Sequence, residues 1–216
     1  MKRRILLFWA VLVVVSIVAC VLLYRFNFIP HKKYTNGDFG INTYTSLSDK
    51  DGDGIDDQTD ILLSVKDYLS KKPKYKSKYY NGGYPDDSYG VCTDVVAQGL
   101  YGAGYDLMQL VDTDIKANRD KYSIDKPDKN IDFRRVRNLK VYFDNTALSL
   151  TTDISKIEEW QGGDIVVFKG HIGIVSEHRN KNGVPFVYHH ANPLQKYYEE
   201  DILEIRDDII GHYRVS

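Results

Sequence analysis

The first apolar feature of the chain is an unbroken run near its amino-terminal end. Ile5–Tyr24 contains Ser16 and the terminal Tyr24 as its only polar residues, and the basic stretch Met1–Arg4 precedes it. A helix of this length spans about 30 Å, which matches the hydrocarbon thickness of a bilayer. The run therefore predicts a transmembrane signal anchor over residues 1–25 that leaves the rest of the chain outside the cytoplasm.

The end of this run leaves two alternatives open. Ile17-Val18-Ala19-Cys20 has the pattern of a bacterial lipobox, in which the cysteine is lipidated and becomes the new amino terminus. Another secretion signal is the second alternative. The apolar run continues through Val21-Leu22-Leu23, where lipoproteins normally turn polar, and this favours an uncleaved anchor. All three interpretations place the chain after residue 25 on the outer side of a membrane.

Beyond the anchor the pattern of apolar positions changes twice. Residues 26–48 are polar and show no helical period, which indicates a stalk or lead-in, and residues 49–60 form an acidic loop. Residues 61–216 are expected to fold as one domain with helices first and a mostly antiparallel sheet after them, which is an α+β fold. The expected helices are 61–69, 92–102, 107–117 and 133–143, and the expected strands are 164–168, 172–176, 184–189 and 209–215.

Composition narrows the functional classes. The 29 Lys and Arg residues balance 30 Asp and Glu residues, and no basic stripe interleaves with aromatic residues, so a nucleic-acid partner is not expected. The chain has two cysteines, Cys20 and Cys92, and Cys20 lies inside the apolar run. The globular part therefore holds one thiol and no internal disulfide.

That single thiol stands where a loop is expected to meet a helix. Cys92 follows Tyr89-Gly90-Val91 and begins the predicted helix 92–102. The free amide groups and the dipole at a helix start stabilise a thiolate, which lowers a cysteine pKa from about 8.5 toward 7. The same amides can hold the oxyanion of a tetrahedral intermediate. A buried structural cysteine is the alternative interpretation of the position alone.

A histidine at the start of an expected strand supplies the base that such a thiol needs. The run Trp160–Phe168 leads through a tight connection into His171, and a β-branched strand follows. A nucleophilic thiol requires a base, and the base requires a partner that orients it. His189 and His190, on the strand across the next hairpin, are the candidates for that partner.

The segments around these residues resemble a known signature. Tyr79-Tyr80-Asn81-Gly82-Gly83 followed by Cys92-Thr93-Asp94 is similar to the Y-x-W-G-G…D-C-S-G signature of the NlpC-type cell-wall cysteine peptidases. The segment from Gly163 to Val175 is similar to their G-D-L-V-F-F…H-V-G-I-Y segment. Within that papain-like group, residues 90–96, 130–139 and 211–214 most resemble an uncharacterised bacterial domain family.

The resemblance implies a papain-like fold, in which a helix delivers the nucleophile against an antiparallel sheet that delivers the base. By position, it makes Cys92 the nucleophile, His171 the general base and acid, and Tyr79 the tyrosine that helps bind the oxyanion. The third polar residue falls at His189 or His190. Because neighbours on a strand face opposite sides, only one can face His171, and we favour His189.

The function that follows is a thiol hydrolase, anchored in a bacterial cell membrane with its catalytic domain outside the cytoplasm, that cleaves amide bonds in peptidoglycan stem peptides. No cofactor is expected for this catalysis. One alternative is a catalytically inactive cell-wall-binding module with the same fold. Another is an acyltransferase or an amidase that acts on a different substrate.

Three further residues are candidate substrate contacts. Asp94 departs from the family signature, and it is either a helix first-turn acid or a contact to substrate. Arg134 and Arg135 carry guanidinium groups that fit the carboxylates of peptidoglycan stems. The alternative is that one of the two arginines is buried in an ion pair with Asp132 or Asp128.

The acidic loop matches the template of a calcium-binding loop at positions 1, 3, 5, 6, 9 and 12. Gly54 stands at the position of the sharp turn, and the predicted helix follows directly. We expect a structural calcium ion, and the alternative is a solvated acidic turn that caps the helix. The expected ligands are the carboxylates of Asp49, Asp51, Asp53 and Asp60, the carbonyl of Ile55, and Asp57 through water.

Overall fold

The structure, a computed structural model, describes residues 2–215 and consists of two compact units, Met1–Lys32 and Lys33–Ser216. The first unit is built on one apolar helix, α1 (Lys2–Arg25), which has no buried residue. By length and composition α1 can cross a membrane, and a signal sequence would have the same properties. The predicted amino-terminal apolar helix is therefore confirmed, and it is compatible with membrane association.

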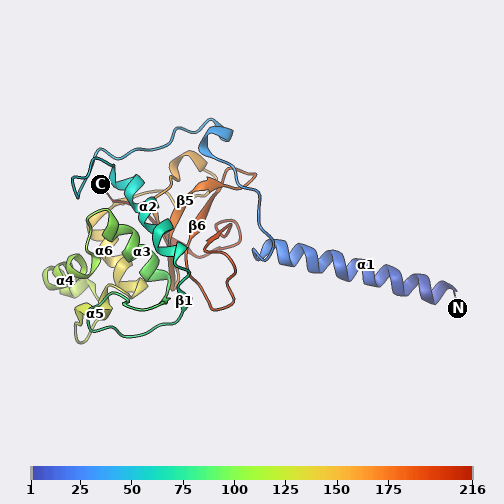
Figure 1. Ribbon diagram of the computed structural model, residues 1–216, viewed down its shortest axis with the longest axis horizontal. Helices are drawn as coiled ribbons and strands as arrows, with labels where there is room; N and C mark the ends of the chain where they lie inside the picture. Colours follow the sequence, from blue (N-terminus) through green and yellow to red (C-terminus); the bar gives the residue numbers. More distant parts are fainter. Residues whose placement is uncertain (1, 216) are drawn as a thin grey trace. The chain divides into compact units, whose positions relative to one another are not determined.

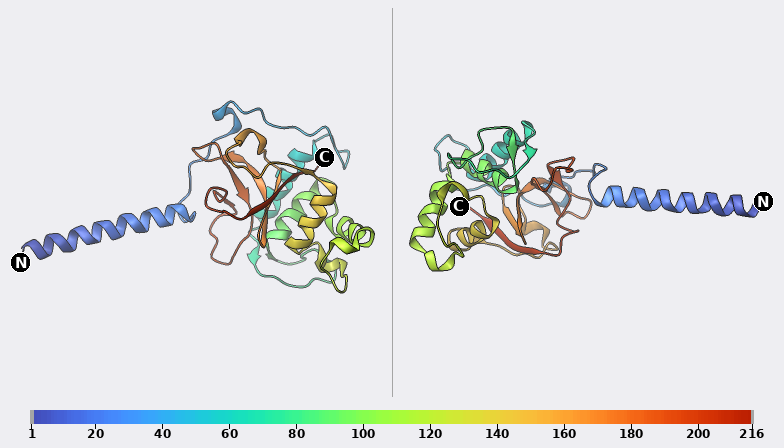
Figure 2. Two further views of the ribbon diagram at one scale, coloured as in Figure 1. Left: turned by 180° about the vertical axis from the view of Figure 1, so that it is seen from behind. Right: turned by 90° about the horizontal axis from the view of Figure 1, so that it is seen from below.

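The second unit is a mixed α+β fold in which helices precede most of the sheet, as the sequence predicts. Its helices α2–α6 lie on one side of the sheet, and α2 and α3 pack on each other and on the sheet (Figures 1 and 2). They are α2 (Asp57–Ser70), α3 (Cys92–Gly102), α4 (Leu107–Ala117), α5 (Lys129–Asp132) and α6 (Val136–Thr146), with short 3-10 turns η1 (Asn36–Phe39), η2 (Arg119–Lys121) and η3 (Ile157–Glu159).

The main sheet has six strands in the order β3-β8-β4-β5-β6-β7, and every neighbouring pair is antiparallel. A separate two-residue pair, β1 and β2, is parallel. The strands are β1 (Lys74–Tyr75), β2 (Tyr89–Gly90), β3 (Leu148–Ser149), β4 (Ile165–Phe168), β5 (His171–Arg179), β6 (Pro185–Tyr188), β7 (Glu199–Glu200) and β8 (Ile209–Arg214).

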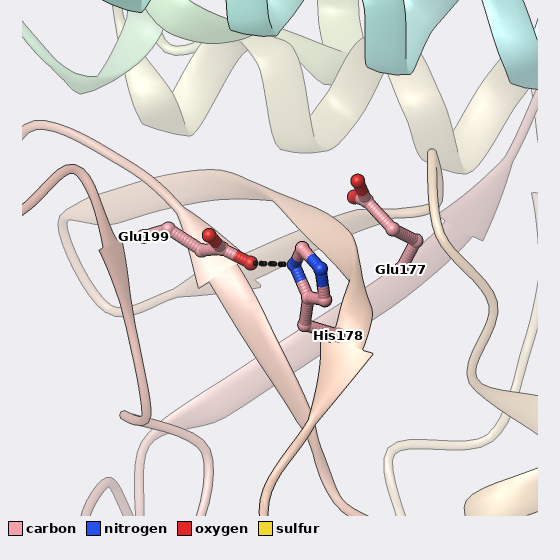
Figure 3. Close-up of side chains that lie close together, drawn as sticks. All are labelled: Glu177, His178 and Glu199. Carbon is pink, nitrogen blue, oxygen red and sulfur yellow. Dashed lines mark hydrogen bonds and ion pairs between the residues drawn. The ribbon is translucent and has the colours of Figure 1, made fainter. Parts of the chain in front are cut away.

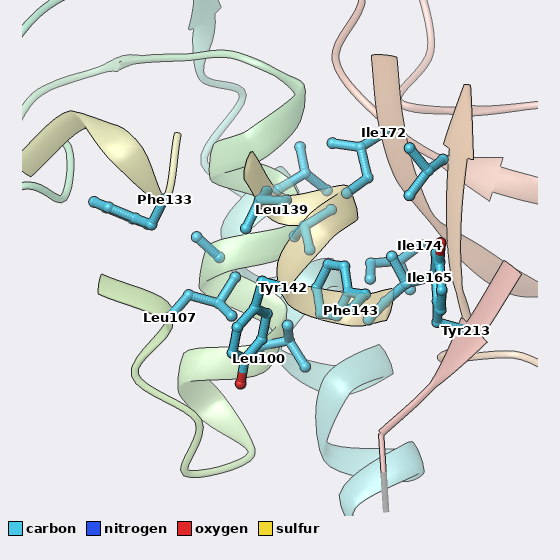
Figure 4. Packing of buried hydrophobic residues seen from close by; sticks show 14 of the residues in the cluster. Leu100, Leu107, Phe133, Leu139, Tyr142, Phe143, Ile165, Ile172, Ile174 and Tyr213 are labelled. Atoms are coloured by element: carbon cyan, nitrogen blue, oxygen red, sulfur yellow. The ribbon is translucent and has the colours of Figure 1, made fainter. Parts of the chain in front are cut away.

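Both faces of the sheet are buried because its strands alternate between two apolar clusters. In β4, Ile165 and Val167 pack with the helices, whereas Val166 and Phe168 pack on the opposite face. The helix-side cluster includes Leu100 of α3 and also residues of α6 (Figure 4). Side chains two residues apart point to the same face of a strand, which is why a continuous apolar run such as Ile165–Phe168 forms a central strand.

One predicted helix differs from the observed one in its position. The sequence predicts a helix over 133–143, but α6 begins at Val136, after the short helix α5. Phe133 is fully buried, and Arg134 makes a buried ion pair with Asp94 of α3. The burial of Phe133 and the ion pair of Arg134 hold these residues in a turn, so the regular helix starts after Arg134.

The segment of the second unit that precedes α2 contacts the end of β5 and the start of α2. Tyr34 forms an isolated antiparallel bridge with Arg179 at the end of β5. The buried Asn36 accepts a hydrogen bond from Nε of Arg179 at 2.5 Å. Further on, the backbone N–H of Ser46 donates to Asp56, the N-cap residue of α2, at 2.9 Å. Residues 33–48, predicted from the sequence to be a stalk or lead-in, thus have fixed contacts with the helices and the sheet.

Candidate active site

The nucleophile and base expected from the sequence begin two elements that pack on each other. Cys92 is the first residue of α3, and His171 is the first residue of β5, which α3 contacts. The backbone N–H of Ile172, the residue after His171, lies close enough to the Cys92 sulfur to favour its thiolate. The structure therefore brings the sulfur beside the start of β5, although no hydrogen bond joins this thiol to the His171 ring within residues 2–215.

The His171 ring is held by a second histidine. Its Nε2 lies 3.0 Å from Nδ1 of His189, and the two rings meet edge to face. The other nitrogen of His189, Nε2, lies 3.2 Å from Oε2 of Glu200 on β7. His171 and His189 are 8% and 3% exposed, so this row of polar groups is screened from water.

The row favours one protonation pattern of the two rings. A carboxylate can only accept a hydrogen bond, so its place beside Nε2 of His189 favours the tautomer that donates from Nε2 and accepts at Nδ1. His171 then donates from Nε2, which leaves its Nδ1 as an acceptor. An acceptor nitrogen on His171 is what a general base for the thiol requires.

Gln195 holds His189 from another side. Its Nε2 donates to the backbone carbonyls of Tyr197 and His189, at 2.8 and 3.2 Å, and its Oε1 accepts from the Ala191 N–H at 2.6 Å. Both amide hydrogens are thus used by carbonyls. The Nε2 of Gln195 also lies 3.4 Å from Nε2 of His189, a longer contact than its two bonds to the carbonyls.

His190 lies apart from this row. Its ring meets the rings of Tyr75 and Tyr198 edge to face, with centroids 5.2 Å away in both cases. Its buried Nδ1 has no hydrogen-bond partner. Of the two histidines considered from the sequence, the structure therefore brings His189 to His171, and His190 to a pair of tyrosines.

Burial dominates the ionisation of the site. Desolvation raises the pKa of the Cys92 thiol to about 11, against the opposing effect of nearby backbone N–H groups. Desolvation, and the neighbouring His189 after it, lowers the pKa of His171 to about 3. The sequence predicts a lowered thiol pKa from the helix start alone. In the folded chain the loss of water outweighs the helix start, so both groups are neutral at pH 7.

Two of the three charged residues expected to contact substrate, Asp94 and Arg134, are instead bonded to each other. The Arg134 guanidinium donates to both carboxylate oxygens of Asp94, from Nε at 2.6 Å and from Nη2 at 2.9 Å. The side chains are 1% and 0% exposed. Asp94 also accepts the Val91 N–H at 2.8 Å, and Arg134 donates to the carbonyl of Lys78 at 2.6 Å. The substrate-binding assignment of this pair is replaced by a structural one, because no face of either charge is open.

Tyr79 and Arg135 lie outside the row of histidines. The Tyr79 side chain is 54% exposed, and its hydroxyl donates to Asp128 at 3.0 Å and accepts from Asn130 at 3.3 Å. The expected role in binding the oxyanion therefore has no contact that supports it. Arg135 is exposed at the N-cap of α6, where it remains open to solvent.

Sequence reasoning missed two residues next to the site. Glu200 had no recognisable motif, and only its place on a strand beside β6 brings it to His189. Tyr68 lies in α2, and the apolar period of that helix gives no sign of a role for its hydroxyl. Its buried hydroxyl has no partner, and it lies so close to Gly90 that a Cβ there would be 2.1 Å away.

The predicted calcium ligands are only partly gathered. Asp49, Asp51 and Asp53 offer oxygens that all lie within 4.8 Å of one another. Asp57 is not available, because its carboxylate accepts the Lys50 N–H at 2.7 Å and the Tyr105 hydroxyl at 2.5 Å. Its expected role as a water-mediated ligand is corrected to that of a buried anchor for the loop.

A second group of metal-binding side chains, not expected from the sequence, lies on the sheet. Glu177, His178 and Glu199 have ligand atoms within 4.8 Å of one another, and His178 bonds Glu199 at 2.7 Å (Figure 3). Lys66 pairs with Glu177 at 2.5 Å, and Lys33 pairs with Glu199. Each carboxylate of this group therefore already has a cationic partner.

Comparison with known proteins finds one matching family and one relative. The family model described as a domain of unknown function, DUF1287, matches residues 63–215. The chain is 35% identical to the uncharacterized protein YijF of Escherichia coli (strain K12) over 151 residues. This alignment covers 66% of this chain and 72% of that protein. No solved structure matches. The matched region includes the cysteine and the histidines of the candidate site, and the acidic loop precedes it.

Proposed function

The chain belongs to the DUF1287 family, and we propose that its Cys92–His171–His189 cluster is the active site of a thiol hydrolase that cleaves amide bonds. The observation that carries the proposal is the row His171–His189–Glu200, in which the two rings are hydrogen-bonded and Glu200 lies 3.2 Å from His189, and which ends at the strand start against which Cys92 lies. A row of three titratable groups, two of them buried imidazoles, that leaves one acceptor nitrogen free is an arrangement that a general base requires and a purely structural histidine does not.

The chemistry proceeds through a thioester. Nδ1 of His171 takes the thiol proton as the Cys92 sulfur bonds to the carbonyl carbon of the amide. The oxygen that becomes negative is stabilised by the backbone N–H groups at the start of α3. The C–N bond then breaks, and the amine leaves with the proton from His171. Water, deprotonated by His171, attacks the thioester and releases the acid, and the sulfur regains its proton.

The neutral resting state sets the order of proton transfer. Burial raises the pKa of Cys92 and lowers that of His171, so an ion pair is not formed in advance. The proton moves as the sulfur attacks, while Glu200 and His189 stabilise the positive charge that develops on His171. The sulfur and the His171 ring must close to hydrogen-bond distance for this step, and substrate binding supplies the closure.

The substrate proposed is the stem peptide of peptidoglycan. Two features support it: the similarity of the Cys92 and His171 segments to NlpC-type cell-wall peptidases, and an amino-terminal helix suited to hold the domain at a membrane. The same order of elements, a cysteine at a helix start and a histidine at the start of an antiparallel strand, supports a papain-like relationship. We further propose that the second unit works outside the cytoplasm.

Digestion of purified cell wall tests the proposal. We expect the full chain in detergent to release peptide fragments and Cys92→Ala to release none while its Tm stays within about 2 °C. Cys20→Ala is the matched control, because it removes the other thiol and should keep full activity. Fragment release by Cys92→Ala would contradict the proposal.

Three outcomes identify the alternatives. Sedimentation of the protein with cell wall, without fragments from any variant, would indicate a binding module with an inactive site. Transfer of the acyl group to an added amine, detected by mass spectrometry, would indicate an acyltransferase. Release of ammonia or an amine from non-wall amides would indicate an amidase with another substrate.

A further inference from the structure

The acidic loop Asp49–Asp60 concentrates negative charge without a compensating cation. Asp49, Asp51 and Asp53 are exposed, and each offers an oxygen within 4.8 Å of the others. Within residues 2–215 none of the three has an ion pair with a lysine or arginine. The one basic residue of the loop, Lys50, has its ammonium 5.8 Å from the ring of Tyr105. In this the loop differs from the Glu177–Glu199 group, where each carboxylate has its own lysine.

A buried carboxylate beside the loop has an oxygen without a partner. Asp60, in the first turn of α2, is 6% exposed, and its Oδ2 has no hydrogen-bond partner. Among the side-chain atoms of this kind in the described chain, it is the one that belongs to a carboxylate. A buried charge is normally paired with another charge or with a metal ion, so this oxygen lacks the ligand that its burial calls for.

The charges nearest Asp60 are those of the loop. The carboxylates of Asp53, Asp51 and Asp49 are the charged groups that act most strongly on the Asp60 carboxylate. The orphan carboxylate therefore lies within the electrostatic field of the gathered group. Like charges at such distances repel one another unless a cation lies between them.

We propose that this loop is a calcium site, in which Asp49, Asp51 and Asp53, the carbonyl of Ile55 and the orphan oxygen of Asp60 bind one Ca²⁺. These residues stand at positions 1, 3, 5, 7 and 12 of a 12-residue loop, the spacing at which such loops place their ligands. Asp60 is not part of the group within 4.8 Å, and the ion draws its carboxylate toward the other three.

The ligand set favours calcium over smaller or softer cations. All five ligands are oxygens, four of them carry charge, and no histidine or cysteine is among them, which excludes a preference for zinc or copper. Asp57 stays on its backbone and tyrosine partners, so water completes the coordination. Ca²⁺ accepts about 6–8 oxygens at flexible angles, whereas Mg²⁺ demands a near-ideal octahedron that this loop does not build.

The bound ion would stabilise the fold and would not take part in the chemistry. The loop lies against the turn after α3, where a Cβ on Gly104 would come within 3.2 Å of Asp51. It also joins residues 46–48 to the start of α2, since Ser46 donates to Asp56 and the Asp57 N–H donates to Ser48. Cys92 begins α3 at the opposite end, about 16 Å along the helix axis.

Melting of the full chain in detergent, after removal of metal by EDTA, tests the proposal. For a dissociation constant on the order of 0.1 mM, in the range of extracellular modules, 2 mM CaCl₂ should raise Tm by about 4–7 °C. MgCl₂ at the same concentration, and KCl at the same ionic strength, should raise it by less than about 1 °C. No rise with calcium, or an equal rise with magnesium, would overturn the proposal.

A substitution in the loop has opposite effects with and without the ion. Asp53→Asn should abolish the calcium-dependent rise in Tm, yet in EDTA it should melt at or above the temperature of the unchanged chain, because it relieves repulsion. Asp67→Asn is the matched control: it removes one exposed acid from α2 outside the loop and should keep the full calcium response. An unchanged calcium response in Asp53→Asn would also overturn the proposal.

Terbium luminescence gives a readout that does not depend on stability. Tb³⁺ binds calcium sites and is sensitised by a nearby aromatic ring, and Tyr105 contacts the loop through Asp57 and Lys50. We expect sensitised emission that calcium displaces and that Asp53→Asn and Tyr105→Leu both reduce at least tenfold. Emission that neither calcium nor Asp53→Asn changes would place the ion elsewhere and contradict the assignment.

Discussion

The buried pair Arg134–Asp94 offers the sharpest test of how the site is built. Changing Arg134 to Met keeps much of the side-chain volume but leaves Asp94 as a buried carboxylate without its cation. The substitution removes the two hydrogen bonds from Arg134 to Asp94, at 2.6 and 2.9 Å, and the one to the Lys78 carbonyl, at 2.6 Å. The remaining Asp94 keeps only the Val91 N–H as a polar partner.

The expected cost follows from the exposures of the two side chains, 1% and 0%. Removing one partner of a fully buried ion pair costs about 3–5 kcal/mol, a large part of the about 5–15 kcal/mol that stabilises an ordinary domain. For a domain of this size that corresponds to a fall in Tm of about 6–20 °C. Arg135→Met is the matched control, since Arg135 is exposed and should change stability by no more than about 0.5 kcal/mol.

A double variant distinguishes the free energy lost with the attraction between the two charges from the free-energy cost of leaving one charge buried and unpaired. Asp94→Leu combined with Arg134→Met removes both charges, and it should recover most of the stability that Arg134→Met loses. Urea unfolding followed by circular dichroism measures the four free energies of the cycle. The coupling energy should exceed about 2 kcal/mol, because the two residues share two hydrogen bonds and both side chains are buried.

A small effect of Arg134→Met on stability would favour the substrate-binding role that the sequence predicts for Arg134. If Arg134→Met melted within about 2 °C of the unchanged chain and raised KM for cell-wall fragments, Arg134 would be a substrate ligand. We expect KM per folded molecule to change little, because both charged side chains of the pair are buried.

Four more expectations concern the site. Glu200→Gln should lower kcat about 10- to 100-fold with little change in KM, because a glutamine amide can donate to His189 and so favours the wrong tautomer; an unchanged kcat would mean that Glu200 does not orient the ring. Because burial holds the pKa of His171 and that of His189 at about 3, unfolding releases each ring to take up a proton below pH 6.5. Stability to urea from this source is therefore complete above pH 6.5 and falls by up to about 1.4 kcal/mol per pH unit and per ring as the pH drops toward 3, and His171→Gln should remove its share of the slope. With the pKa of Cys92 raised to about 11, iodoacetamide labelling in a Cys20→Ser background should accelerate steadily from pH 6 to 9, and fast labelling at pH 6 would show an ion pair that the structure does not contain. Tyr68→Phe should leave Tm within about 1 °C, since the buried hydroxyl has no partner to lose, and a fall in kcat would then show that this hydroxyl serves the reaction.

Local pattern in the sequence was enough to locate most elements. The apolar period of residues 107–117 predicts α4 with the observed bounds, and the β-branched run before Phe168 predicts β4 to within one residue. The junction at Cys92 was also visible, because a helix start depends on a few neighbouring residues. Each of these features is encoded within about ten residues of the chain, which is the range over which periodicity carries information.

The choice of partner for each charged group was decided by the tertiary structure. The sequence predicts Arg134 as a substrate contact, with an ion pair to Asp132 or Asp128 as the alternative, and the structure pairs it with Asp94, forty residues earlier in the chain. Asp57 matched a ligand position in a loop template, yet Tyr105 from the turn after α3 occupies its carboxylate. In both cases the competing partner comes from a distant segment, and only packing brings the two together.

The sequence by itself determined that a lone thiol would begin a helix, that a histidine would begin a strand of an antiparallel sheet, and that an apolar helix would precede both. Only the tertiary structure decided that Glu200 completes the row through His189, and that the thiol is neutral at rest. The physical reason is that helix starts and strand patterns follow from short-range backbone geometry. Burial and hydrogen-bond partners depend on which remote surfaces exclude water around a group, and no local pattern records that.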